Sequence, residues 1–108
     1  MILCGKEHCK WGGTDIKRED ILVPAFTENY TNGGSYTIPM PSISNLIMIE
    51  SIDGYFLYDS GTINVPKEGE NGLYYFTITH DNSNIYIKTG ANWGSCETHL
   101  TVHAIVET

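Results

Sequence analysis

Three cysteines and one histidine form the sharpest candidate for a metal site in this sequence. Cys4-x4-Cys9 and Cys96-x2-His99 offer three thiolates and an imidazole, the ligands of a closed tetrahedral zinc site. The first and last strands of a β-sandwich commonly lie together, so the two halves could meet. Against this, the segment around Cys96 has the pattern of a regular strand, and reduced cysteines are common small core residues. We predict no metal and no cofactor, and whether these four residues converge stays open at this point.

His99 and His103 share one face of an expected strand, which also suggests a metal site. Four residues at a rise of ~3.3 Å separate them by about 13 Å, too far for two ligands whose bonds to one ion are about 2 Å. Equivalent histidines around a threefold axis could meet, but we favour two surface histidines on a solvated strand face.

Catalytic motifs are lacking. No segment matches Gly-x-Ser-x-Gly, and a triad of Ser60, His80 and Asp81 cannot be inferred from spacing, because His80 stands beside an expected turn where polar residues are common. Glu50 and Asp59 would suggest glycoside hydrolysis, but the expected hairpin places the two carboxylates on a diagonal. We predict that the protein is not an enzyme.

Aromatic residues are the remaining chemical signal. The chain has 7 tyrosines and 2 tryptophans. Alternation along the expected strand 73–79 turns Tyr75 outward, Tyr86 opposes the core pair of the next strand, and Trp93 lies in a loop. Flat amphipathic rings suit a sugar-binding platform or a contact between subunits, so Tyr75, Tyr86 and Trp93 are the predicted ligand-binding residues. The alternative is that tyrosines simply suit half-buried strands.

The elements that must position these residues are short strands. Residues 47–52 and 55–58 flank Asp53-Gly54, which favours a two-residue hairpin turn, and strands at 73–79 and 85–88 flank a run of turn-forming residues at 81–84. Extended pieces are also expected around Tyr36 and Ile38 and at residues 62–65. The pattern predicts an all-β protein, an antiparallel β-sandwich or jelly roll of about 7–9 short strands.

The two ends of the chain differ in pattern. Residues 1–20 lack sustained alternation and are expected to be a loop-rich lead-in with room for one short edge strand, whereas residues 21–108 form the sandwich domain, with a strand opening at residue 21. Residues 98–107 alternate as a final strand. Its expected core face carries Leu100, Val102, Ala104 and Val106, and its expected solvent face carries His99, Thr101, His103, Ile105 and Glu107.

Composition narrows the function classes. With 108 residues, 41% of them hydrophobic, the chain forms one globular domain. A net charge of −7, with only 6 scattered basic residues, argues against nucleic acid and anionic membrane surfaces as partners. No stretch approaches the ~20 apolar residues of a membrane span. The N-terminus has no apolar core of a secretory signal, so we expect synthesis in the cytoplasm.

The pattern of the second half resembles the small β-sandwich tip domains of bacteriophage tail fibres and related virion proteins. The residues that carry the resemblance are 72–79, 85–88, Trp93-Gly94-Ser95 and 101–106, within a region of roughly 44–108. The resemblance implies a non-enzymatic, virion-associated protein that forms a homo-oligomer, with a trimer favoured, and binds a surface glycan or another virion protein. The alternative is a monomeric carbohydrate-binding or zinc-stabilised module of a cellular protein.

Overall fold

The computed structural model describes residues 2–4, 9–11, 14–65 and 76–108, with side chains described for 15–65 and 76–108. Over these ranges the chain consists of strands and their connections, without a helix. The strands form two antiparallel sheets, so the all-β, sandwich-like prediction is confirmed.

Within the described ranges, one sheet contains seven strands and the other contains three. The larger sheet is built from β1 (Ile2–Cys4), β2 (Cys9–Trp11), β3 (Thr14–Leu22), β4 (Phe26–Tyr30), β6 (Leu46–Tyr58), β7 (Gly61–Asn64) and β10 (Gly94–Glu107). The smaller sheet is built from β5 (Ser35–Pro39), β9 (Asn84–Lys88) and β8 (Thr77–His80), in that order.

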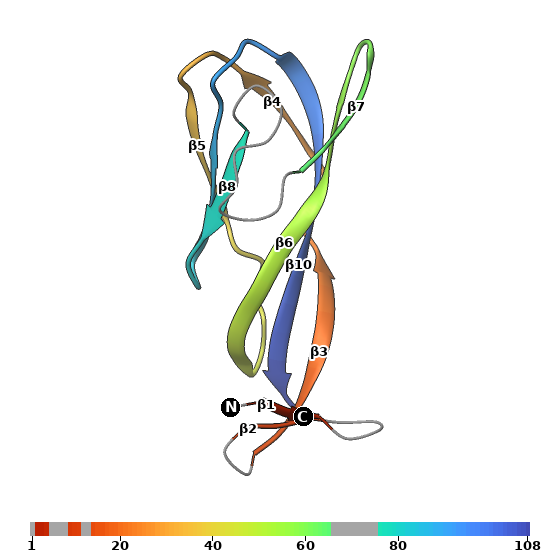
Figure 1. The fold of residues 1–108 in the computed structure, drawn as a ribbon, viewed down its shortest axis with the longest axis vertical. Coiled ribbons are helices and arrows are strands. Elements are labelled where there is room, and N and C mark those ends of the chain that lie inside the picture. Colours follow the sequence, from red (N-terminus) through yellow and green to blue (C-terminus); the bar gives the residue numbers. More distant parts are fainter. Residues whose placement is uncertain (1, 5–8, 12–13, 66–75) are drawn as a thin grey trace.

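The molecule is elongated, with extents of 47 × 23 × 23 Å, and its two ends differ (Figure 1). At one end, which we call the sandwich end, the smaller sheet packs on β4, β7 and the adjoining parts of β6 and β10. At the other, the ribbon end, the remaining part of β10 lies between β3 and β6. We call the side of the larger sheet that faces away from the smaller sheet its outer face.

The main core lies between the sheets. Phe56, Cys96 and Leu100 of the larger sheet pack with residues such as Ile78 and Ile87 of the smaller one, all at most 1% exposed. The core continues along the inner face of the ribbon end. There the segment that joins β5 to β6 adds its partly buried Met40 and Ile43 to the core cluster.

The expected hairpin turn at Asp53-Gly54 is wrong. Both residues lie inside the continuous strand β6, where Asp53 pairs with Thr101 and Gly54 with Leu100 of β10. Gly54 has a φ of +143°, and a Cβ on it would lie 1.9 Å from the carbonyl oxygen of His99. The glycine therefore permits a close approach between two strands. Glycine occurs both in turns and at such close approaches, and the Asp-Gly pattern does not distinguish the two.

The N-terminal expectations also need correction. Instead of a loop-rich lead-in, the described residues before 21 form β1, β2 and most of β3, and β3 pairs with β10 from Ile16 to Leu22. Residue 21 thus lies near the end of a strand rather than at its start. The charged side chains that hid the strand pattern are tolerated because β3 is an edge strand over most of its length, where charge protects against unwanted pairing.

Several other expectations are confirmed. β8 and β9 pair across residues 81–83, and β5 and β7 occupy the predicted extended pieces. β8 matches residues 77–79 of the strand predicted at 73–79, and residues 73–75 lie outside the described residues. On β10, Leu100, Val102, Ala104 and Val106 are buried, as predicted for the core face. Ile105, on the opposite face, is also buried, in a small cluster with Ile16, Ile47 and Met48.

Candidate functional site

The outer face of the larger sheet carries an apolar patch. In the described part of the chain the exposed large hydrophobic side chains are Leu22 (77% exposed), Tyr55 (38%) and Leu57 (37%). Their register partners on β10 are Thr101, His99 and Glu97, which all lie on the outer face. Since such side chains are usually scattered, their presence on one face is informative. We call Leu22, Tyr55, Leu57 and His99 the outer patch.

A shallow hollow of about 410 Å³ opens within this patch, between Leu22 on one side and Tyr55 with His99 on the other. It exists because the edge of the sheet is interrupted. β3 pairs with β10 as far as Leu22 and β4 resumes at Phe26, which leaves residues 23–25 opposite only two residues of β10. Pro24, inside this interruption, has no N–H for the ladder.

One wall of the hollow is a stacked pair of rings. Tyr55 and His99 are direct cross-strand partners, and their ring centroids are 4.6 Å apart at an interplanar angle of 17°. Nε2 of His99 lies 2.7 Å from Oε1 of Glu97, two residues away on the same strand. The stack and the carboxylate together fix the imidazole, so the wall presents a rigid aromatic surface.

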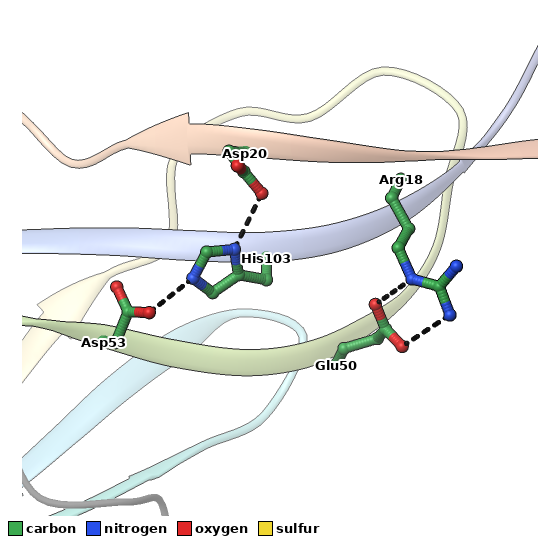
Figure 2. Close-up of polar contacts among 5 residues, drawn as sticks. All are labelled: Arg18, Asp20, Glu50, Asp53 and His103. Atoms are coloured by element: carbon green, nitrogen blue, oxygen red, sulfur yellow. Dashed lines mark hydrogen bonds and ion pairs between the residues drawn. The ribbon is translucent and has the colours of Figure 1, made fainter.

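Next to the patch, a histidine lies between two carboxylates (Figure 2). Nδ1 of His103 is 2.7 Å from Oδ1 of Asp20 on β3, and Nε2 is 2.7 Å from Oδ2 of Asp53 on β6. Since His103 belongs to β10, the three residues join three neighbouring strands. The hydrogen bond to Asp20, followed by the one to Asp53, raises the pKa of His103 above its ordinary value of 6.5.

A salt bridge lies farther along the same strands. Nε of Arg18 on β3 is 2.9 Å from Oε1 of Glu50 on β6, and Nη2 donates to the other carboxylate oxygen at 3.4 Å (Figure 2). The two-pronged geometry is the favourable one for an arginine and a carboxylate. The outer face of the ribbon end therefore carries a chain of cross-strand charge pairs, alongside the apolar patch.

The predicted ligand-binding residues have different surroundings. Tyr75 lies outside the described residues. Trp93 packs on Phe76 and Tyr58, with ring centroids 5.6 Å and 5.5 Å away, at the margin of the core. Tyr86 points away from the core on β9, and its hydroxyl donates to Asp81 at 2.5 Å, which raises the pKa of Tyr86 and lowers that of Asp81. Tyr86 and Trp93 thus do not form one platform, and ligand binding by the three residues stays a prediction.

The structure does not bring the candidate zinc ligands together. Cys9 is registered with Ile16, and Ile16 with Glu107, so Cys9 is near the C-terminal end of β10, whereas Cys96 is near its start. Eleven residues of strand separate Cys96 from Glu107, a span of about 35 Å. Cys96 is buried, and burial raises the pKa of its thiol. Within the described residues, no group of three or more His, Cys, Asp or Glu side chains is arranged to hold a metal ion.

The other constellations are likewise separated. Glu50 and Asp59 do not face each other across a hairpin, because Glu50 is inside β6 and Asp59 follows the end of the same strand, about 30 Å away. The carboxylate of Asp81 accepts from the backbone N–H groups of Ser83 and Asn84, at 2.7 and 2.8 Å, so it organises its own turn. The described residues also contain no helix long and apolar enough to cross a membrane.

Sequence reasoning missed most of the outer patch. The sequence pattern places Leu22 at the start of a strand, whereas the structure places it at the exposed end of β3, and the pattern places Tyr55 in a hairpin that does not form. The sequence feature that could have located the patch is the pair His99 and His103, because both lie on the predicted solvent face of β10, which is the outer face that carries the patch.

Comparisons of the chain with protein-family models, with curated proteins and with solved structures found no match.

Proposed function

We propose that this protein is a non-enzymatic β-sandwich module that binds a partner through its outer patch. The proposed context is a structural or receptor-binding part of a virion-like assembly, comparable with the tip domains of bacteriophage tail fibres. In that setting the chain forms a homo-oligomer, with a trimer favoured, and contacts a surface glycan or another virion protein. It is made in the cytoplasm and becomes associated with the virion.

The observation that carries this proposal is the concentration of exposed apolar side chains around one hollow. Leu22 is 77% exposed, and the stacked Tyr55 and His99 face it across the hollow. Covering apolar surface contributes about 25 cal/mol per Å². A flat aromatic wall with the carboxylate of Glu97 beside it suits either a sugar ring or an apolar side chain of a neighbouring copy.

The hydrogen-bond partners of the outer-face histidines, His99 and His103, support a binding function rather than catalysis. His99 is held by Glu97, and both ring nitrogens of His103 are held by Asp20 and Asp53. A histidine that activates a nucleophile has a hydroxyl or thiol on one ring nitrogen. Here carboxylates occupy the contacts that the structure describes for these rings.

Light scattering across a hundredfold dilution series tests the assembly part of the proposal. We expect a mass of a small multiple of 12.0 kDa, with three chains favoured. Leu22→Ser and Tyr55→Ser should shift the mass towards one chain. Thr79→Ser, on an exposed position of the smaller sheet, is the matched control and should leave the mass unchanged. A wild-type mass that stays at 12.0 kDa over the whole series would reject the assembly.

A glycan array tests the receptor-binding part independently. We expect Tyr55→Ser to abolish the binding shown by the wild type and Thr79→Ser to preserve it. Tyr86→Ser examines the surface predicted from the sequence. If Tyr86→Ser abolishes binding and Tyr55→Ser does not, the binding surface lies on the smaller sheet and the outer patch is rejected as the site.

A further inference from the structure

We propose that Asp20, His103 and Asp53 form a proton-dependent clamp that holds the edge strand β3 against β10 and β6, so that loss of one proton from His103 loosens the end of β3 that carries Leu22. The proposal is independent of the function proposed above, because it concerns the attachment of a strand and not the identity of a partner.

The hydrogen-bond geometry requires a doubly protonated ring. Each ring nitrogen of His103 is 2.7 Å from a carboxylate oxygen, Nδ1 from Asp20 and Nε2 from Asp53 (Figure 2). An ionised carboxylate only accepts hydrogen bonds, so both nitrogens must donate, and only the imidazolium has two N–H groups. When one proton leaves to solvent, one of the nitrogens turns a lone pair towards a carboxylate and that contact becomes repulsive.

The charges around His103 make its attachment to both carboxylates depend on its second proton. From β3 it is faced by Asp20 and Arg18, and from β6 by Asp53 and Glu50. Arg18 and Glu50 are bound to each other, so their charges largely cancel. A neutral His103 would therefore leave two carboxylates without a cation between them.

Along β10 itself, the titratable groups at the same spacing from His103 are His99 and Glu107, four residues before and after it. His99, four residues before His103, is bound to Glu97 and stacked on Tyr55. At about 13 Å along the strand, it is too distant to replace the charge of His103. The clamp thus depends on a single side chain.

β3 has few other attachments near the clamp. β2 supports it only from Thr14 to Ile16, and over residues 17–22 its described strand partner is β10 alone. Most side chains of this stretch are exposed, and Ile21 is only partly buried. Because apolar burial contributes little here, cross-strand polar contacts carry a larger share of the attachment than they do between the two sheets.

The direction of the pH effect follows from the raised pKa of His103. The contribution of the clamp is fully present below the unfolded-state pKa of about 6.5 and is lost as the pH rises through the higher folded-state pKa. Leu22 is two residues beyond Asp20 on β3, so the loosening reaches one wall of the hollow.

Amide hydrogen exchange measured by NMR tests the clamp. Between about pH 5.5 and pH 8.5, a range that spans the titration of a raised histidine, protection of the β3 amides at residues 17–22 should fall relative to Ile85 and Ile87 of β9, after correction for intrinsic exchange. We expect a fall of about threefold or more, in step with the His103 ring signal. Unchanged relative protection while His103 titrates would overturn the proposal.

Variants assign the effect to His103. His103→Gln should give low, pH-independent protection of β3, whereas the matched control His80→Gln, on β8 of the smaller sheet, should keep the wild-type profile. Asp20→Asn and Asp53→Asn leave the histidine in place and should each weaken the pH dependence, which keeps the test open if His103→Gln does not fold. A wild-type profile in His103→Gln, or a molecular mass that changes in parallel with protection in light scattering, would refute the clamp.

Discussion

The sandwich end and the ribbon end share β6 and β10 but place different chemistry along them. At the sandwich end, aromatic rings fill the space between two sheets, with Tyr30, Phe56 and Phe76 each 0% exposed. Phe56 and Phe76 are stacked with centroids 4.4 Å apart, and Tyr30 meets both edge-on. At the ribbon end, the polar contacts that the structure describes across the outer face of β3, β10 and β6 are the His103 clamp and the salt bridge of Arg18 with Glu50.

The difference shows how each end is stabilised. Two facing sheets bury large side chains from both sides, so the sandwich end has the larger hydrophobic contribution. The outer face of the ribbon end has no second sheet among the described residues, and its buried residues there are Ile16 and Ile105. Charge pairs in contact with water each contribute little to stability, and that contribution depends on protonation and is screened by salt. The stability of the ribbon end should therefore respond to pH and salt, while that of the sandwich end should not.

Gly54→Ala should have the largest effect, because the glycine lies where the two ends meet. Its Cβ would lie 1.9 Å from the carbonyl oxygen of His99, so β6 would have to separate from β10. We expect a loss of more than about 4 kcal/mol in the free energy of unfolding, or failure to fold. The matched control is Gly33→Ala, since Gly33 has a φ of +75° but open space around its Cβ position.

Urea denaturation followed by circular dichroism measures both variants. Gly33→Ala should cost only about 1–2 kcal/mol, the strain of a left-handed backbone. Equal losses in the two variants would mean that Gly54 needs only its unusual φ, and that the close approach of the two strands is not a constraint.

Phe56→Ala and Ile105→Ala compare the two apolar clusters directly. Phe56 contacts the rings of Tyr30 on β4 and of Phe76, which directly precedes β8, so its truncation should cost about 3–5 kcal/mol through the lost transfer energy and the cavity. Ile105 is buried in the smaller outer cluster, which can collapse more easily, and its truncation should cost closer to 2 kcal/mol. Denaturation midpoints in urea give the difference, and a larger loss for Ile105→Ala would reverse the ranking of the two ends.

Tyr30→Phe examines a polar pair inside the sandwich end. The Tyr30 hydroxyl is 2.6 Å from Oγ1 of Thr98, both side chains are buried, and burial raises the pKa of Tyr30. Loss of this contact should cost about 1 kcal/mol, because Thr98 still has the carbonyl of Cys96 at 3.4 Å. A double-mutant cycle with Thr98→Val isolates the pair, and a coupling energy near zero would show that the hydroxyl contributes nothing to stability.

Glu50→Gln should have the smallest effect. The salt bridge to Arg18 is exposed, so its removal should change the free energy of unfolding by less than about 0.5 kcal/mol at moderate salt. The same variant measured at low salt should show a slightly larger loss, since screening is weaker. A loss above about 1 kcal/mol would mean that the ribbon end depends on this pair more than its exposure indicates.

The elements predicted correctly are those whose pattern is local. β8, β9 and the core face of β10 follow from period-two alternation beside turn-forming residues. The alternation assigns each side chain to the core or to solvent without knowledge of which strands pair. β3 was missed because its sequence, TDIKREDIL, has few apolar residues to mark a buried face. The strand forms because β10 supplies a ladder of backbone hydrogen bonds, which side-chain periodicity does not report.

For this protein the sequence determined the all-β class, the core face of β10 and the position of His99 and His103 on the opposite face. Only the tertiary structure decided that Asp53-Gly54 lies inside a strand and that Asp20 and Asp53 meet His103 from separate strands. It also separated Cys96 from Cys9 by most of the length of β10. The physical reason is that alternation depends on neighbouring residues and is visible in a short segment, whereas cross-strand register depends on which distant segments pair, and no local pattern reports that.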